Sequence, residues 1–440
     1  MGVRPMKLAV TLVACLSVTA CIPAAAPAAS PSPTQTPRDL GRETLAANDG
    51  WAAATTGTTG GSKADAAHTK TVMDRRQLVA ALGDPADAAP KIVYVSGTID
   101  ANVDDGNKSL RCEDYATAGY TLDAYLKAYD PASFGRTKRP SGPLEDARSA
   151  SQKQQAARVQ IKVGPNTTIV GRSGARLVGV DLVVDQVDNV IIRNLAFIDA
   201  FDCFPQWDPT DGSQGNWNSQ YDNISVNGGT HVWIDHNAFG DGDRTDAKQP
   251  MHLGRPYQVH DGQVDIGKAA DLVTVSWNRF TDHDKTMLIG SSDTATADSG
   301  KLNVTLHHNV FSSVGQRAPR VRFGRVHVYD NLYVIPGAQG YTYSWGVGVE
   351  AKIYAESNVF QVTGVAPDRL IRAFGGKALH ATGTVLFDGA HMTPLDPLAS
   401  YNGANDPKLG GDVGWTPSLV GPVDRADEVP ATVDRGAGPG

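Results

Sequence analysis

Short runs of β-branched and other apolar residues recur along most of the chain, with turn residues between them. From about residue 159 onward no long helical pattern interrupts these runs. Residues 91–99 predict an earlier strand that includes a glycine. Residues 74–82 instead carry Leu78, Val79 and Leu82 at helical spacing. The pattern therefore predicts an all-β body preceded by a short N-terminal helix.

Several of the predicted strands end in the same way, with an asparagine followed two residues later by phenylalanine or tyrosine. The asparagines are separated by 41, 31, 22 and 27 residues; they are Asn237, Asn278, Asn309, Asn331 and Asn358. A short period with variable insertions is typical of a solenoid, in which each coil buries its apolar face on its neighbours. Asparagine tolerates left-handed backbone, and stacked copies can form hydrogen bonds along the coil axis.

Two other all-β architectures fit this repeat less well. A propeller requires regular four-strand blades, and a sandwich would show no shared Asn-x-Phe signature. Residues 190–197 are a weaker copy of the repeat, with Asn194 one place early. We expect a β-solenoid over residues 39–390, with the longer insertions gathered on one side as a binding face.

Two regions fall outside the repeat. Residues 100–158 form an insertion that is partly helical around residues 120–129 and polar towards its end. The tail, residues 391–440, is rich in Pro, Gly and Asp and has Trp415 as an aromatic anchor. We expect the tail to pack over the end or the side of the solenoid.

The first 21 residues have the features of an export signal. Arg4 and Lys7 precede an apolar run over residues 8–20, which is too short to span a bilayer permanently. Residues 22–38 are mainly Ala, Pro, Ser and Thr and predict a tether without a core. We therefore expect a protein that acts outside the cytoplasm.

The end of the apolar run suggests a lipid anchor. Val18-Thr19-Ala20-Cys21 resembles a bacterial lipobox, in which the cysteine is acylated after cleavage. The alternative is an ordinary signal peptide that is cut at an Ala-x-Ala site within residues 24–26. We favour anchoring through Cys21.

Cys112 and Cys203 are the cysteines of the predicted folded body. In an oxidising compartment they could pair and close a loop of about 90 residues, worth roughly 4 kcal/mol in the chain-entropy model. The alternative is two buried thiols, and the sequence supplies no geometry to decide between them.

The charge balance excludes one class of partner. The formal net charge is −7 at pH 7, whereas a nucleic-acid-binding domain presents a basic face. Aromatic residues make up only 7% of the chain, which is few for a platform that stacks single-stranded bases. We expect no nucleic-acid partner.

Three aspartates are candidates for a metal site. Asp261 and Asp265 would lie about 13 Å apart in an extended strand, so a shared ion requires a bend, which Gly262 could supply. Asp222 lies about one long coil earlier, where stacking could bring it alongside. Three oxygen ligands without clustered thiols suit Ca²⁺ rather than zinc. Spacing alone, however, favours ordinary turn aspartates.

A basic segment follows, with Arg317, Arg320 and Arg322 within six residues around Pro319. In a strand Arg320 and Arg322 would share a face, and the proline argues against a regular central strand. Lys285 lies one coil earlier. These cations would ordinarily be solvated, but beside three carboxylates they would fit an anionic, metal-bridged ligand. No His-x₃-His or Cys-x₂-Cys pair typical of a zinc site is present, so the histidines are interpreted as turn or core residues.

Four longer motifs, in order, carry a specific resemblance. They are Val232-Trp233-Ile234-Asp235-His236, Asp261-Gly262-Gln263-Val264-Asp265-Ile266, His283-Asp284-Lys285-Thr286-Met287-Leu288-Ile289-Gly290 and Arg317-Ala318-Pro319-Arg320-Val321-Arg322. Together they resemble the secreted, calcium-dependent pectate lyases, and the similarity runs from Ile92 to about Phe360. Several motifs in the right order are far more specific than any one of them.

The resemblance implies a right-handed parallel β-helix that is secreted, monomeric and active without a protein partner. It implies cleavage of polygalacturonate by β-elimination with Ca²⁺. By motif, Asp222, Asp261 and Asp265 are the implied calcium ligands, and Arg317 is the implied base. Lys285 and Arg322 are implied to bind the substrate carboxylate, and Arg320 is implied to have a structural role.

An arginine base is chemically demanding, because free arginine titrates above pH 12. Nearby Ca²⁺, Lys285 and Arg322 would disfavour its charged form, so we expect an alkaline optimum. The alternatives are a calcium-independent pectin lyase and a surface β-helix that binds a glycan without cleaving it. A hydrolytic polygalacturonase would carry Asn-Thr-Asp or Gly-His-Gly triplets, which the sequence lacks.

Overall fold

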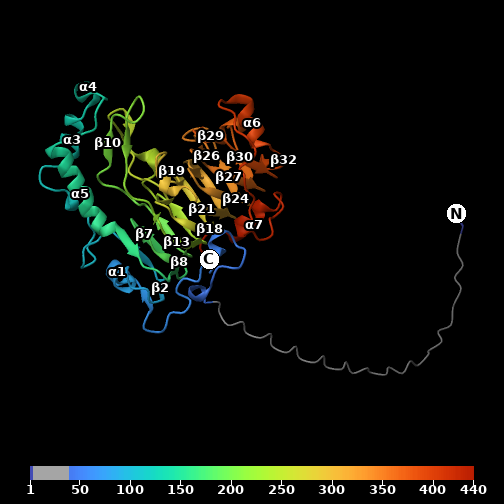
Figure 1. Cartoon of the computed structure of the whole chain (residues 1–440), viewed down its shortest axis with the longest axis horizontal. Coiled ribbons are helices and arrows are strands. Elements are labelled where there is room, and N and C mark those ends of the chain that lie inside the picture. Colours follow the sequence, from blue (N-terminus) through green and yellow to red (C-terminus); the bar gives the residue numbers. More distant parts are fainter. Residues whose placement is uncertain (3–38) are drawn as a thin grey trace. The chain divides into compact units, whose positions relative to one another are not determined.

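The predicted strands stack into three long sheets in a computed structural model that describes residues 1, 2 and 39–440. The predicted signal peptide (1–21), the tether (22–38) and the lipobox cysteine Cys21 lie outside these described residues, apart from the first two. In Figure 1 successive coils of the 39–440 unit run from the green strands beside α5 to the orange-red strands beside α6.

The first sheet contains, in order, β1 (Thr69–Val72), β2 (Lys91–Val95), β5 (Thr167–Gly171), β8 (Asp188–Arg193), β13 (Thr230–Asp235), β18 (Asp271–Ser276), β21 (Asn303–His307), β24 (Arg325–Tyr329), β27 (Lys352–Glu356) and β30 (Leu379–Thr382). The second contains β29 (Ile371–Phe374), β26 (Trp345–Gly348), β23 (Arg320–Val321), β20 (Leu288–Ile289), β17 (Val264–Gly267), β12 (Ile224–Asn227), β7 (Asp181–Asp185) and β4 (Gln160–Val163). The third contains β3 (Thr98–Asp100), β6 (Arg176–Val178), β9 (Ala196–Ile198), β14 (Ala238–Gly240), β19 (Arg279–Lys285), β22 (Val310–Gln316), β25 (Leu332–Ile335), β28 (Val359–Val362), β31 (Val385–Phe387) and β32 (Met392–Pro394).

Neighbouring strands in these sheets pair in parallel, except for the antiparallel β31–β32 pair. Each coil contributes one strand to each sheet before the next coil begins, and the predicted parallel β-helix is confirmed. Two antiparallel hairpins project from the coils, β10 (Gln206–Asp208) with β11 (Asn216–Asn218) and β15 (Met251–His252) with β16 (Arg255–Pro256).

The helices lie outside the sheets. They are α1 (Arg75–Leu82), α2 (Cys112–Tyr115), α3 (Leu122–Ala128), α4 (Pro131–Phe134), α5 (Pro143–Val159), α6 (Pro397–Ala404) and α7 (Val429–Gly436), with 3₁₀ turns η1 (Leu40–Arg42), η2 (Trp51–Ala53), η3 (Asp246–Lys248), η4 (Thr296–Asp298) and η5 (Pro367–Arg369). None of the helices among the described residues is both long and apolar enough to cross a membrane.

The N-terminal prediction needs two corrections. Helix α1 starts after the cap Asp74 and buries Leu78 and Leu82, but Val79 is exposed, because it lies about 100° around the helix from Leu78, beyond the edge of the buried face. The strand predicted over residues 91–99 is two strands in different sheets. Gly97 has φ +74° and turns the chain between them, a backbone conformation that favours glycine.

The repeated asparagines form the predicted ladder inside the coil. Each of Asn278, Asn309 and Asn331 donates from Nδ2 to the amide oxygen of the next ladder asparagine at 3.0 Å. The residue before each ladder asparagine, and not the asparagine itself, has the left-handed φ. Asn194 occupies that preceding position, which explains why its copy of the repeat is one place early.

A stack of aromatic rings runs parallel to the ladder. Consecutive rings lie with their centroids between 4.4 and 5.0 Å apart; they are Phe197, Phe239, Phe280, Phe311, Tyr333 and Phe360. Ring stacking and the buried aliphatic residues of all three sheets form one continuous core. The ladder and the stack fix the register of successive coils.

The insertion over residues 100–158 is more helical than its polar sequence predicts. Its longest helix, α5, has a narrow buried face that includes a charged pair, Glu145 and Arg148, with their nearest atoms 2.8 Å apart. The insertion shares a separate aromatic core with residues 201–259, including Trp207 and Trp217. A disulfide between Cys112 and Cys203 also joins these two segments.

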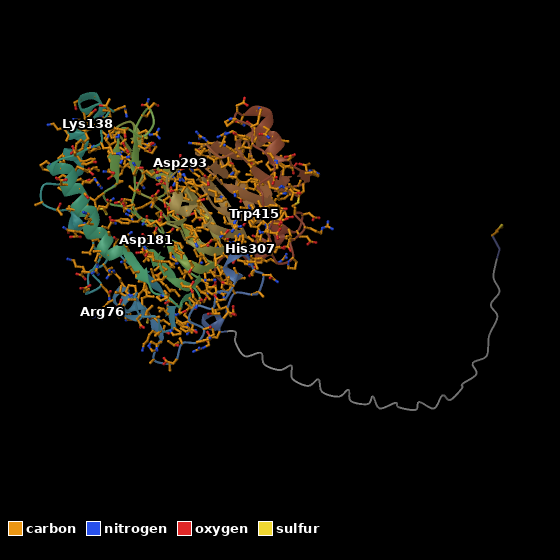
Figure 2. The ribbon with its side chains drawn as sticks, in the orientation of Figure 1. Arg76, Lys138, Asp181, Asp293, His307 and Trp415 are labelled. Carbon is orange, nitrogen blue, oxygen red and sulfur yellow. A yellow bond between two sulfur atoms is a disulfide. The ribbon has the colours of Figure 1, made fainter. Side chains whose placement is uncertain are left out.

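The C-terminal tail packs along the side of the coils. Trp415 contacts Trp51 and Tyr354, and its indole nitrogen donates to the Lys352 carbonyl (Figure 2). Helix α7 adds Val429 and Val433 to an apolar cluster with outward residues of the third sheet.

Candidate active site

The three candidate aspartates meet on adjacent coils of the second sheet. Ser225 of β12 pairs with Asp265 of β17, which places Asp222 beside the bend that precedes β17. The amide of Gly262 donates to Asp222 Oδ1 at 2.9 Å. A Cβ at position 262 would lie 2.3 Å from Asp265 Oδ1 and 2.9 Å from Asp222 Oδ1, so only glycine fits between these carboxylates.

The two other charged residues come from the next two coils. Lys285 ends β19 and pairs in register with Gln316 at the end of β22, so that Arg317 follows directly. Lys285 Nζ lies 3.1 Å from Asp261 Oδ1. Arg317 has φ +59° and turns the chain before Pro319, whose peptide bond with Ala318 is cis.

The carboxylates and cations perturb one another's ionisation. Burial raises the pKa of Asp222 well above its usual range, and the charges of Asp265 and Asp261 raise it further. Burial and Asp261 raise the pKa of Asp265 to about 7. Burial also acts to raise the pKa of Asp261, but Lys285 and Arg317 outweigh it and the pKa is lowered. The site therefore concentrates more negative charge than the chain alone neutralises.

Arg317 behaves differently from the expectation. Burial favours its neutral form, but the charges of Asp261 and Asp265 outweigh burial and raise its pKa. The nearby cations were expected to disfavour the charged form of this guanidinium, but in the chain by itself the neighbouring carboxylates have the larger effect on its pKa. Its Nε is buried and has no hydrogen-bond partner within the described residues.

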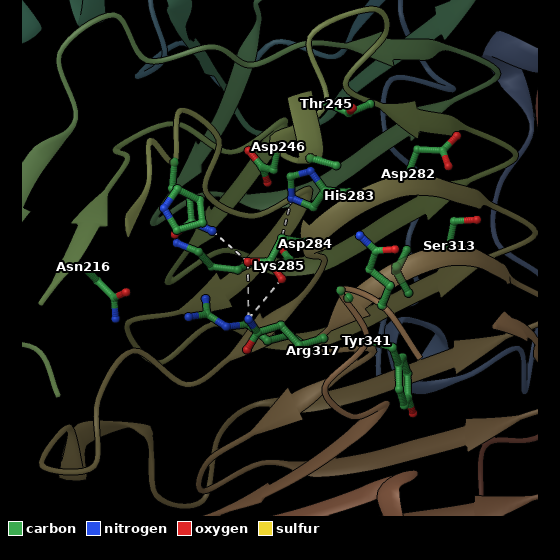
Figure 3. A pocket seen from close by; sticks show the side chains of 18 of the residues that line it. Asn216, Thr245, Asp246, Asp282, His283, Asp284, Lys285, Ser313, Arg317 and Tyr341 are labelled. Atoms are coloured by element: carbon green, nitrogen blue, oxygen red, sulfur yellow. Dashed lines mark hydrogen bonds between the residues drawn. The ribbon is translucent and has the colours of Figure 1, made fainter. Parts of the chain in front are cut away.

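Lys285 and Arg317 both project into a pocket of about 980 Å³ (Figure 3). The predicted binding face formed by insertions corresponds to this pocket, since residues 211–218, 245–258 and 335–341 contribute to its wall. The lining carries charges of both signs. Its cations are Arg255, Lys285, Arg317, Arg320 and Arg372, and its carboxylates are Asp211, Asp246, Asp282 and Asp284. Gln258, Gln316 and Tyr341 add hydrogen-bonding groups.

Arg320 and Arg322 lie in different surroundings. Arg320 lines the pocket, with its guanidinium carbon 3.9 Å from the ring centre of Phe374. Arg322 is buried, donates to the Gly290 carbonyl at 2.9 Å and pairs with Asp293; it is not among the lining residues of this pocket. Val321 between them points into the core, so the two arginines do share the outer face of the strand.

Sequence reasoning missed two features of the site. Arg372 lines up with Arg320 across the sheet, because Arg320 pairs with Gly346 and Gly346 pairs with Arg372. The missing side chain at Gly346 leaves room between the two arginines. Only the register of the coils reveals this pair; no motif contains both residues.

The second missed feature is His283. Its Nδ1 bonds to the Asp241 carboxylate at 2.8 Å, and its Nε2 lies 2.7 Å from the Asp261 carbonyl and 3.1 Å from the Lys285 carbonyl. Because all three partners only accept, both ring nitrogens must donate. His283 thus holds the backbone of a candidate metal ligand and of the candidate lysine, and it is more than the core residue that was expected.

Comparison with known proteins agrees with this geometry. The family model described as pectate lyase matches residues 142–392. A pectate lyase of Bacillus subtilis (strain 168) is 52% identical over 407 residues, which cover 91% of this chain and 94% of that protein.

Solved structures give the same result. An arginine-to-lysine mutant of a Bacillus subtilis pectate lyase is 51% identical and superposes with a TM-score of 0.87, covering 92% of this chain and 99% of that one. A pectate lyase bound to a hexasaccharide has the same identity, coverage and TM-score. With the family model matching more than half of the sequence, the chain belongs to the pectate lyase family.

Proposed function

We propose that this pectate lyase cleaves α-1,4-linked polygalacturonate by calcium-assisted β-elimination. The observation that carries the proposal is that three aspartates meet Lys285 and Arg317, two cations that line the pocket. A polyuronate supplies one carboxylate per sugar, which matches a pocket lined by Arg255, Arg320 and Arg372. The hexasaccharide bound to a similar pectate lyase supports an extended sugar ligand.

The aspartates fit Ca²⁺. Their donors are all oxygen, and Asp222 and Asp265 carry raised pKa values that a cation would relieve. The three aspartates do not bring one oxygen each within 4.8 Å of one another, unlike two other groups of side chains among the described residues. Opposite ligands of Ca²⁺ can lie up to about 5 Å apart, so a wider arrangement suits this large ion. When bound, Ca²⁺ would neutralise the carboxylates and polarise the substrate carboxylate.

The proposed base is Arg317. Its neutral guanidine would take the proton from C5 of a uronate, and the C4–O bond would then break to leave a 4,5-double bond. The departing oxygen would take up a proton from solvent and the guanidinium would return its proton to solvent, so that no water is consumed. In the chain by itself Asp261 and Asp265 hold this group protonated. Deprotonation therefore depends on these carboxylates being neutralised, and the reactive fraction grows with pH.

Lys285 and Arg322 are proposed to hold substrate carboxylate. Lys285 is already at the pocket, paired with Asp261. Arg322 is paired with Asp293, so a role in binding requires its guanidinium to exchange that partner for a uronate. Arg322 lies outside the pocket wall, whereas Lys285 lines it.

The test follows unsaturated product by ultraviolet absorbance with polygalacturonate in Ca²⁺, in EDTA, and with Arg317→Ala. We expect chelation to abolish the rate and Arg317→Ala to lower kcat by about 10²–10⁴-fold, the usual range for removing a general base. Arg76→Ala, an exposed position on α1, is the matched control. The wild-type rate should rise towards alkaline pH; an optimum near pH 5 would contradict the arginine base.

The same assay separates the alternatives. Full activity on methyl-esterified pectin in EDTA would indicate a calcium-independent pectin lyase. Binding of the polymer without product under any condition would indicate a non-catalytic glycan-binding protein.

We also propose that the protein is exported and anchored through Cys21. The support is the charged, apolar and Cys-terminated order of residues 1–21. Cys21→Ser should release the protein from the cell envelope without changing its specific activity. Equal release of the wild type and the variant would favour an ordinary signal peptide.

A further inference from the structure

The left-handed position before each ladder asparagine forms a column of side chains on the outside of the coils. In three successive coils its occupants are Trp277, His308 and Asp330, with φ values of 56°, 54° and 52°. The ring of His308 stacks on Trp277 with centroids 4.2 Å apart, which fixes its orientation. The same position in adjacent coils therefore points an imidazole and a carboxylate towards a common point.

The C-terminal tail supplies a third group. The amide of Asp424 donates to Asp330 Oδ2 at 2.9 Å, and Asp424 Oδ2 lies 3.3 Å from His308 Nε2. His308 Nε2 is also 3.8 Å from Asp330 Oδ2. One ligand atom from each of these three residues lies within 4.8 Å of the other two.

The position of His308 allows one of its nitrogens to bind a metal ion. His308 Nδ1 lies 2.9 Å from His307 Nδ1, so one of these two nitrogens donates and the other accepts. When His308 donates from Nδ1, its Nε2 is free to bind an ion beside the carboxylates of Asp424 and Asp330.

Asp330 gives an independent indication. It is completely buried, and its Oδ1 has no hydrogen-bond partner among the described residues. A buried carboxylate oxygen without a partner is costly in free energy. A cation beside this carboxylate, whose Oδ2 lies 3.8 Å from His308 Nε2, would offset that cost.

A second group of histidine and aspartate side chains among the described residues has no ring nitrogen free to bind a metal ion. His260 lies among Asp199, Asp241 and Asp246, and both of its ring nitrogens bond to carboxylates, at 2.9 Å and 3.0 Å. Both nitrogens must donate, so that ring has no lone pair to offer a metal.

We propose that His308, Asp330 and Asp424 bind a divalent transition-metal ion of the Zn²⁺ type, which ties the C-terminal tail to the coils. Tetrahedral Zn²⁺ with nitrogen and oxygen ligands places them about 3.4 Å apart, close to the separations given above. The imidazole disfavours Ca²⁺, which prefers oxygen ligands. A hydrogen bond from His308 Nδ1 to His307 Nδ1, 2.9 Å away, would be the kind of support that metal-binding histidines use.

The test is titration of the full chain with Zn²⁺, and separately Co²⁺, in buffer that contains millimolar Ca²⁺ throughout. We expect one ion per chain, visible Co²⁺ absorption bands, and a melting temperature raised by about 3 °C at a hundredfold excess over Kd. Asp265→Asn, in the proposed calcium site, should bind Zn²⁺ as the wild type does. This result keeps the test independent of the proposed lyase mechanism.

Variants locate the ion. His308→Gln, Asp330→Asn and Asp424→Asn should each weaken Zn²⁺ binding at least tenfold, whereas Asp427→Asn should not. Asp427 is exposed, lies on the same segment and pairs with Arg425. Equal affinity in Asp424→Asn and the wild type would overturn the proposal. So would the absence of binding at millimolar metal, or nitrogen NMR showing that His308 Nε2 keeps a proton with Zn²⁺ present.

Discussion

At the scale of single residues, the pocket is defined by which charges lie next to which. Lys285 and Arg317 face carboxylates, and each carboxylate responds differently, because Asp261 has cations beside it and Asp222 has other aspartates. His283 supports this arrangement from behind, through the carbonyls of Asp261 and Lys285. The residue identities alone would not distinguish these surroundings.

We predict that His283→Gln weakens calcium binding and lowers kcat by about 10–100-fold, the usual cost of losing a group that orients a metal ligand. A glutamine cannot donate to Asp241 and to both carbonyls together. Calcium affinity is measured by calorimetry, and kcat and KM by the lyase assay. His391→Gln, an exposed position, is the control. A lower melting temperature with unchanged calcium affinity and kcat would contradict this positioning role.

Asp202 gives a pH prediction that is independent of the pocket. It is fully buried, and burial raises its pKa to about 6 despite hydrogen bonds from Phe204, Gln152 and Gln220. Between the unfolded pKa near 3.9 and this value, the folded state holds a proton that the unfolded state has lost. The contribution of Asp202 to stability is therefore full below about pH 4 and falls by about 1.4 kcal/mol per pH unit up to pH 6.

The measurement is the free energy of unfolding against pH for the wild type and Asp202→Asn. The variant should lack this part of the slope, whatever its overall stability. Parallel curves between pH 4 and pH 6 would show that Asp202 does not titrate in this range.

At the scale of elements, the asparagine ladder and the ring stack hold successive coils in register. Each ladder asparagine bonds to main-chain groups and to its neighbour, so the ladder links coils of quite different length. The variable loops between strands can then change without moving the strands that carry Asp265, Lys285 and Arg317. The active site depends on this internal register.

We predict that Asn309→Ala lowers the free energy of unfolding by about 3 kcal/mol, because several buried partners lose a hydrogen bond at once. These partners are Val275, Asn278 and Asn331. Ser312→Ala, three residues further on and half-buried, is the control. Chemical denaturation measures both; equal loss in the two variants would contradict a special role for the ladder.

At the scale of the 39–440 unit, two separate hydrophobic cores have different roles. The long coil core is continuous, whereas a second aromatic cluster under the helical insertion supports the hairpin that carries Trp217 into the pocket wall. The Cys112–Cys203 disulfide ties the insertion to this hairpin region across 91 residues.

We predict that replacing both cysteines by serine destabilises the protein by up to about 4–5 kcal/mol, the chain-entropy value for a loop of this length. Tryptophan fluorescence during denaturation reports on the cluster that contains Trp207 and Trp217. The same change is expected when the wild type is reduced before unfolding. Identical midpoints for the wild type and the double variant would show that packing alone holds the insertion.

The sequence by itself determined the architecture, because a repeat such as Asn309-Val310-Phe311 and Asn331-Leu332-Tyr333 can bury its rings only by stacking coils. Its ordered motifs also indicated the family. The tertiary structure decided what depends on register and burial. It aligned Arg372 with Arg320, aimed His283 at two carbonyls, and brought Asp424 to His308 and Asp330. These contacts join residues far apart in the chain, and electrostatic effects such as the raised pKa of Arg317 depend on distances that spacing does not contain.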